Sequence, residues 1–244
     1  MKYSLPNEQI EVRKVVEMYK PFHGKNTEQM PLLLSEGRSP LWTARFMRRR
    51  IDHSNALPDL VSYLDTSDLI AYDSRKRSND VKIILTVDKN GRVTPNGRKV
   101  LDLINSNTKL TPDYAVPISE VYDALDGIVV PKVEIGVIER DLKEKEILDS
   151  RIWRIVARNP DEVPTEFAED KGLLKEYACW VKTQTKQDEN MGVYLDSNSD
   201  IAKLKAAYVN WLECRSQLCG EGSLVSVNGR FVGFLAPEAP STTD

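Results

Sequence analysis

The chain has 244 residues, of which 41% are hydrophobic and 29% charged, and its net charge is −3. This composition excludes a disordered protein and predicts an ordinary globular one, because enough apolar surface is present to offset the loss of chain entropy. No stretch approaches the length of an apolar membrane helix, and the N-terminus turns polar too early for a signal peptide. With an odd number of cysteines and no N-x-[S/T] acceptor, we expect a cytoplasmic protein that contacts no membrane.

The charge is divided unevenly along the chain. Residues 1–100 hold 18 Lys and Arg against 12 Asp and Glu, a balance of +6, and the remaining residues hold 16 against 25, a balance of −9. A basic first part raises the local concentration of phosphate-bearing ligands. Attraction between the two parts explains the division equally well, so both interpretations stay open.

The first part is expected to combine helices with an antiparallel sheet. One helix is predicted over residues 7–20, and a second over 40–53, where Ser39 caps the start and Pro40 occupies the first turn. The apolar run 32–34 fits either a brief strand or a segment packed on the core. Strands are predicted over 61–64, 69–72 and 81–87, with a hairpin loop over 73–80 and a further turn at Asn90–Gly91.

The later pattern is mainly helical. Short helices are predicted over 95–104 and 118–125, followed by a strand over 128–138 that Pro131 interrupts. Longer helical patterns cover 141–149, 150–158, 170–186 and 198–218, the last with Leu204, Tyr208 and Trp211 at helical spacing. A type I′ hairpin is predicted from strands 224–227 and 231–235 around Asn228–Gly229, and residues 237–244 form a frayed tail.

These elements predict an α+β fold with a small, mostly antiparallel sheet in the first part, a mainly helical second part and a C-terminal β-hairpin. The first part spans residues 1–139, the acidic second part spans 140–236, and the tail spans 237–244. The two parts can also pack as one compact domain.

The helix predicted over 40–53 carries the most suggestive group of side chains. Arg45, Arg48 and Arg49 share one helical face, and guanidinium groups bind phosphate bidentately. We therefore predict a surface for nucleic acid or a phosphorylated ligand, made of Arg38, Arg45, Arg48, Arg49, Arg50, Arg75, Lys76 and Arg77. The alternative is that Trp42 and Phe46 anchor the helix in the core while its arginines are solvated or pair with acidic residues.

No common catalytic, nucleotide-binding or metal-binding motif is present, so we expect no metal and no cofactor. The first choice is a binding protein that recognises an anionic partner through the basic helix. An enzyme with an unrecognised acid–base cleft is an alternative, and its candidate residues are Asp65, Asp68, Asp73, Tyr72 and His53. A non-catalytic scaffold or oligomer subunit is the third alternative.

Overall fold

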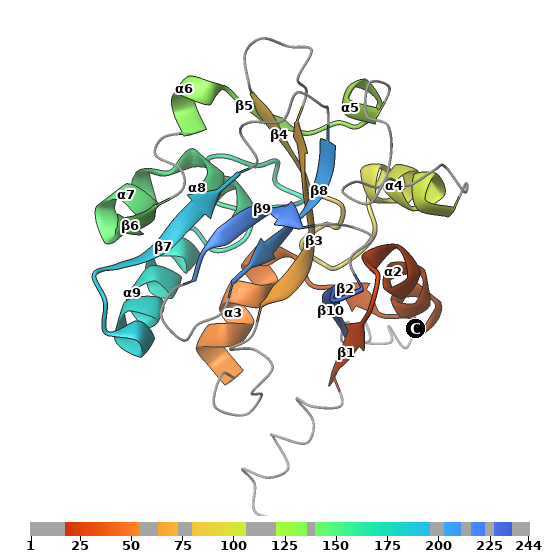
Figure 1. The fold of residues 1–244 in the computed structure, drawn as a ribbon, viewed down its shortest axis with the longest axis horizontal. Helices are drawn as coiled ribbons and strands as arrows, with labels where there is room; N and C mark the ends of the chain where they lie inside the picture. The colour runs from red at the N-terminus through yellow and green to blue at the C-terminus, as the bar shows by residue number, and fades with distance from the viewer. Residues whose placement is uncertain are drawn as a thin grey trace, which may run out of the picture.

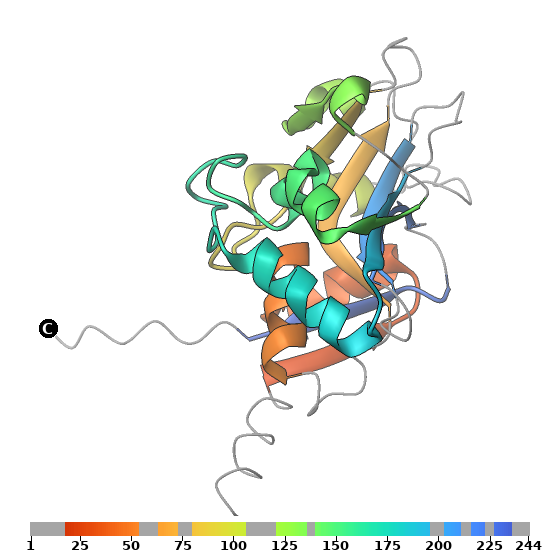
Figure 2. The ribbon, with the colours of Figure 1, turned by 90° about the vertical axis from the view of Figure 1, so that its left-hand side faces the viewer.

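The computed structural model describes residues 18–53, 63–72, 80–105, 121–135, 140–195, 203–210, 216–222 and 227–235. These ranges form two β-sheets, and α3, α7, α8 and α9 lie against one face of the larger sheet (Figures 1 and 2). The strands are β1 Tyr19–His23, β2 Ser39–Pro40, β3 Leu64–Tyr72, β4 Val81–Ile84, β5 Ile128–Val130, β6 Asp141–Lys143, β7 Glu189–Tyr194, β8 Lys203–Val209, β9 Leu218–Gly222 and β10 Arg230–Phe234. The helices are α2 Asn26–Ser35, α3 Thr43–His53, α4 Pro95–Asn105, α5 Val121–Ala124, α6 Lys132–Ile135, α7 Glu144–Asp149, α8 Arg151–Val156 and α9 Leu173–Thr185.

The larger sheet has seven strands in the order β5-β4-β3-β8-β9-β7-β6. Its neighbours are antiparallel except for β7 and β9, which pair in parallel, so the sheet is mixed. Strands β3 and β4 form the predicted hairpin, with Tyr72 opposite Val81, while its loop over 73–79 lies outside the described residues. All nine residues of β3 are buried, which fits a strand covered on both faces.

The smaller sheet has three strands in the order β1-β10-β2. Tyr19 of β1 lies opposite Phe234 of β10, and His23 lies opposite Arg230. Each of the two sheets therefore joins strands from before residue 140 to strands from after it.

A buried polar stretch, Asp65–Asp68, lies where β3 passes between the two sheets, and the register of β3 with β8 shifts there. The side chains and backbone of this stretch form hydrogen bonds outside the regular pairing of β3 with β8. The Asp65 carboxylate accepts from the Arg230 backbone N–H at 2.9 Å, the Ser67 N–H donates to the Leu41 carbonyl at 2.9 Å, and the Thr66 hydroxyl donates to the Ala207 carbonyl at 2.8 Å. The stretch thus ties β10 and the segment before α3 to the larger sheet.

The main core fills the space between the larger sheet and its covering helices. Its largest apolar side chains include Trp42, Phe46, Trp153 and Tyr177, each at most 1% exposed. None of the helices within the described ranges combines the length and apolar character that spanning a membrane requires.

Several predicted elements are confirmed. The helix predicted over 40–53 is α3, although it begins at Thr43 because Ser39 and Pro40 pair with β10 as a strand. The helices over 95–104, 150–158 and 170–186 correspond to α4, α8 and α9. The turn at Asn90–Gly91 is present, and Gly91 has the positive φ of +80° that favours glycine. The apolar run 32–34 belongs to α2.

The predicted fold class is wrong, because the second part is not mainly helical. It supplies five strands, and the segment predicted as a helix over 198–218 contains β8 and the first residue of β9. The prediction of a C-terminal hairpin is also wrong. Strand β10 pairs with β1 and β2 in the smaller sheet, and both of these strands come from the first 40 residues of the chain. Most of the predicted partner strand over 224–227, the tail over 237–244 and most of the helix over 7–20 lie outside the described residues.

Candidate anion-binding site

The arginines of α3 divide between two environments. Arg50 is fully buried and donates to the Tyr177 hydroxyl at 2.8 Å, the Ser216 hydroxyl at 3.0 Å and the Asn210 carbonyl at 2.9 Å. Arg48 forms ion pairs with Glu176 at 2.8 Å and with Asp170 at 3.7 Å. Both side chains therefore serve the packing of α3 against α9 and its surroundings.

Arg38 belongs to a third environment, beside the smaller sheet. Its guanidinium lies 3.5 Å from the Glu36 carboxylate and donates to the Met18 carbonyl at 3.2 Å. Arg75, Lys76 and Arg77 lie outside the described residues. The eight predicted residues do not form one basic surface in the part of the chain that the structure describes.

Arg45 and Arg49, which we call the arginine pair, lie one helical turn apart on α3 and face the smaller sheet. The Arg45 Cζ is 5.6 Å from the centroid of the Phe234 ring, and the Arg49 Cζ is 2.9 Å from the centroid of the Tyr19 ring. The two rings stack on each other with centroids 6.2 Å apart. Paired positions on β1 and β10 thus build an aromatic platform for both guanidinium groups.

Arg49 lacks the acceptors that a buried guanidinium normally has. Its side chain is 2% exposed, and Nε, Nη1 and Nη2 have no hydrogen-bond partner. Burial lowers the pKa of Arg49 to about 10, and nearby Arg45 adds to this effect. The Tyr19 hydroxyl, which lies close to the guanidinium without the geometry of a hydrogen bond, and Asp52 oppose it. The group therefore stays charged at neutral pH, and among the described residues no carboxylate forms an ion pair with either member of the arginine pair.

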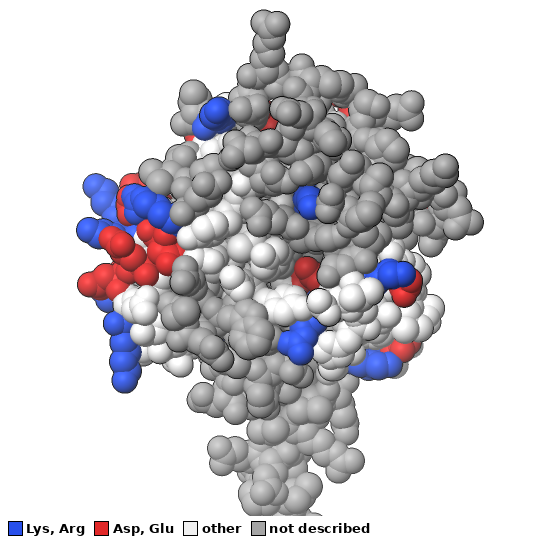
Figure 3. Space-filling view, in the orientation of Figure 1, with Lys and Arg blue, Asp and Glu red and all other residues white. Residues whose placement is uncertain are grey.

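Another described part of the surface carries charges of both signs. Lys and Arg alternate with Asp and Glu on the side where α7, β6 and β7 lie (Figure 3). The ion pairs there include Arg140 with Glu146, Lys143 with Glu189 at 3.6 Å, and Lys182 with Asp188 at 2.6 Å. Such a surface carries little net field, so it does not compete with the arginine pair as an anion site.

The residues proposed for an acid–base cleft have separate partners. Asp68 is fully buried and pairs with Arg158 at 3.2 Å, and the Tyr72 hydroxyl donates to the Gly220 carbonyl at 2.9 Å. Asp73 and the side chain of His53 lie outside the described residues. Among the residues that are described, no group of three or more His, Cys, Asp or Glu side chains is arranged to hold a metal ion.

The carboxyl group of Asp65 has an unusually high pKa. Burial raises the pKa of its carboxyl from the ordinary 3.8 to about 6, although the bond from the Arg230 N–H acts in the opposite direction. Because the raised pKa belongs to the folded state, folding takes up a proton between pH 3.8 and about 6. The associated stability is complete below pH 3.8 and is lost as the pH rises through about 6.

We expect Asp65→Asn to remove this pH dependence. At about 1.4 kcal/mol per pKa unit, the variant should gain up to about 3 kcal/mol in free energy of unfolding above pH 6, because the buried charge is gone while the acceptor for Arg230 remains. Below pH 4 the two proteins should be equally stable. Urea unfolding followed from pH 4 to 8 measures this, and a variant less stable than the native protein at pH 8 would contradict it.

The sequence places Arg45 and Arg49 on one helical face but does not indicate the rings beneath them. Tyr19 and Phe234 lie near opposite ends of the chain and meet only through the pairing of β1 with β10. No local pattern in the sequence indicates that contact, since it depends on a long-range strand pairing.

Comparison with known proteins gives a fold and no family. No family model matches the sequence, and no curated protein matches it. One similar solved structure is described as "Accommodation of massive sequence variation in Nanoarchaeota by the C-type lectin fold"; it is 14% identical, with a TM-score of 0.56, over 88% of this chain and 96% of that chain. At this identity the likeness concerns the fold alone, and the fold of this chain is similar to the C-type lectin fold.

Proposed function

We propose that this chain is a recognition module that binds an anionic group of a partner through Arg45 and Arg49. The observation that carries the proposal is the buried Arg49 guanidinium, whose nitrogens have no hydrogen-bond partner. A buried cation without acceptors is destabilising, and an anion that supplies acceptors relieves that cost. Phosphate is the best match, because its oxygens fit the paired N–H groups of a guanidinium.

In this proposal the anion binds first at Arg45. Its side chain is partly exposed, whereas the Arg49 nitrogens are covered. One helical turn separates the two residues, so the charge of Arg49 attracts an anion that is bound at Arg45. The anion can form direct hydrogen bonds to Arg49 only after the atoms that cover its nitrogens have moved aside. Binding is therefore coupled to a local rearrangement.

Among the described residues, the arginines divide between internal and unpaired positions, as expected of a fold that tolerates sequence variation. The similar solved structure is described as a fold that accommodates massive sequence variation. A fold that tolerates variation must separate the residues that hold its core from those that are free to change. In this chain Arg50 and Arg158 have internal partners that hold the core, whereas Arg45 and Arg49 have aromatic platforms and no acceptor among the described residues.

Fluorescence anisotropy with a fluorescein-labelled single-stranded oligonucleotide, which presents many phosphates, tests the proposal across a salt series. We expect binding that weakens with salt. Arg45→Gln and Arg49→Gln should each weaken it about tenfold or more, because a charged hydrogen bond contributes about 1.5–3 kcal/mol. Arg48→Gln is the matched control, since Arg48 lies on the same helix but is paired with Glu176; it should change the affinity less than about threefold.

The control distinguishes binding at a specific site from non-specific electrostatic attraction, because each of the three variants removes one positive charge. Equal losses in the three variants would show that only net charge matters and would contradict the proposal. Absence of binding at low salt excludes the oligonucleotide as a ligand, and it contradicts the proposal if inorganic phosphate also fails to bind.

A further inference from the structure

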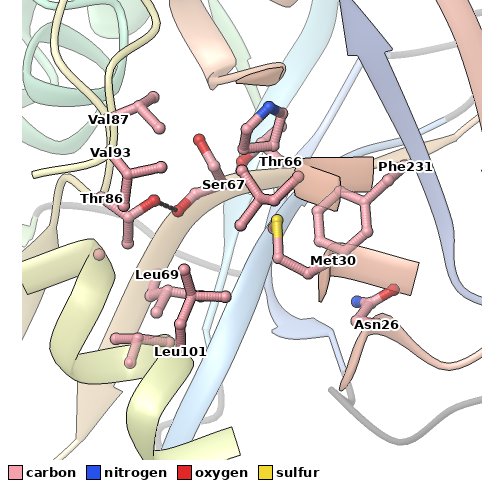
Figure 4. Close-up of a pocket in the computed structure, with 14 residues that line it drawn as sticks. Asn26, Met30, Thr66, Ser67, Leu69, Thr86, Val87, Val93, Leu101 and Phe231 are labelled. Atoms are coloured by element: carbon pink, nitrogen blue, oxygen red, sulfur yellow. Dashed lines mark hydrogen bonds between the residues drawn. The ribbon is translucent and has the colours of Figure 1, made fainter. Parts of the chain in front are cut away.

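A small cavity lies between α2, α4, β3 and the smaller sheet, separate from the arginine pair. Its volume is about 40 Å³, and it is partly enclosed. Apolar side chains form most of its wall, among them Met30, Leu69, Val93, Leu101 and Phe231 (Figure 4). None of the described residues that line it is charged.

One polar side chain in the wall lacks a hydrogen-bond partner. Ser67 is 1% exposed, and its Oγ has no partner. The buried Asn26 amide also lines the wall, but it interacts with the Asp65 carboxylate. The neighbouring hydroxyls differ, since Thr66 donates to the Ala207 carbonyl and Thr86 donates to the Ser67 carbonyl at 2.7 Å. Buried polar groups are almost always satisfied, so the Ser67 hydroxyl is suited to bond a polar group that enters the cavity.

Close backbone contacts fix the walls. A Cβ at Gly97 of α4 would lie 2.3 Å from the Thr86 carbonyl oxygen, and a Cβ at Gly229 would lie 2.3 Å from the Asn26 Oδ1. Only glycine allows these approaches, which hold α4 and the amide of Asn26 in place. In Figure 4, Met30 and Phe231 lie between Asn26 and Ser67, so apolar side chains separate the amide from the Ser67 hydroxyl.

We propose that this cavity binds a small uncharged group that carries a hydrogen-bond donor and acceptor beside apolar carbon, of the size of a primary amide or a hydroxymethyl group. About 40 Å³ accommodates about three water-sized atoms, which sets the size. The apolar wall and the absence of charge among its described lining residues set the neutrality, and the Ser67 hydroxyl, which can donate and accept, sets the need for hydrogen bonds. This site is independent of the proposed anion site.

Methyl-detected NMR of the full chain, titrated with acetamide and with ethanol, tests the proposal. We expect saturable shifts in the methyl signals of Leu69, Val93 and Leu101, with a Kd in the millimolar range because the ligand is so small. Ser67→Ala should weaken acetamide binding about tenfold, the effect of one lost hydrogen bond. Val93→Leu, which fills the cavity, should abolish the shifts.

A control variant and a measurement of folding accompany the titration. Leu32→Ala, at a position 48% exposed on α2, is the control and should leave the titration unchanged. Thermal unfolding of each variant shows whether it is folded, and Ser67→Ala should fold because it removes only an unpartnered hydroxyl. Shifts that stay linear, or that persist in Val93→Leu, would overturn the proposal and indicate a cavity that holds water alone.

Discussion

Replacing Arg158 with alanine is expected to lower the free energy of unfolding by about 3–5 kcal/mol. Arg158 and Asp68 are both 0% exposed, and their charged groups lie 3.2 Å apart. Asp68 also accepts from the Thr43 N–H at 2.8 Å, at the start of α3. Loss of the guanidinium would leave an uncompensated buried carboxylate, and burial of an unpaired charge is among the most destabilising changes a core can suffer.

Arg151→Ala is the matched control. Arg151 is on α8, close to Arg158 in sequence, but its ion pair with Glu134 is exposed and its ion pair with Glu162 is only partly buried. Such pairs contribute about 0–1 kcal/mol. Arg158 has a left-handed backbone with φ of 58°, which alanine would share, so the comparison reports on the side chain. Urea unfolding that shows equal losses in the two variants would contradict a structural role for the buried pair.

Trp42→Ala should also lower the free energy of unfolding by about 3–5 kcal/mol, because it removes a large, fully buried ring. The indole N–H donates to the Glu169 carboxylate at 3.1 Å, and the ring meets Phe234 edge to face with centroids 5.6 Å apart. Trp42 therefore joins the segment before α3 to the smaller sheet and to the loop that follows α8.

Trp180→Ala provides the comparison for Trp42. Trp180 is only partly buried on α9 and stacks on Tyr177, so its loss should cost about 1–2 kcal/mol. Guanidinium chloride unfolding of both variants gives the two values. A Trp42 variant as stable as the Trp180 variant would show that the smaller sheet does not depend on this contact.

Helix α3 was predictable because its pattern is local. Trp42 and Phe46 lie four residues apart beside the face that carries the arginines, and the helix requires no distant partner to be recognised. The same pattern placed Arg45, Arg48 and Arg49 on one face. It could not show that Arg48 reaches an acidic residue of α9 while Arg45 and Arg49 rest on aromatic rings, since those contacts depend on tertiary packing.

The strands of the second part were missed for a physical reason. Consecutive residues of β8, from Leu204 to Ala207, are all buried, so the strand shows no alternation of apolar and polar positions. Leu204, Tyr208 and Trp211 then resemble a helical stripe by spacing alone. Similarly, Asn228–Gly229 indicates a turn correctly, but the partners of the following strand are Tyr19–His23 and Ser39–Pro40, which no short-range signal can identify.

The most direct test of the account follows arginine Nε–H signals by NMR while inorganic phosphate is added to the full chain. We expect saturable shifts for Arg45 and Arg49, with smaller changes in the ring signals of Tyr19 and Phe234 beneath them. Arg48 and Arg50 should not respond, because internal carboxylate, hydroxyl and carbonyl groups already bind them. Saturable shifts at Arg48 with none at the arginine pair, or no saturable shift at any of these residues, would contradict the account.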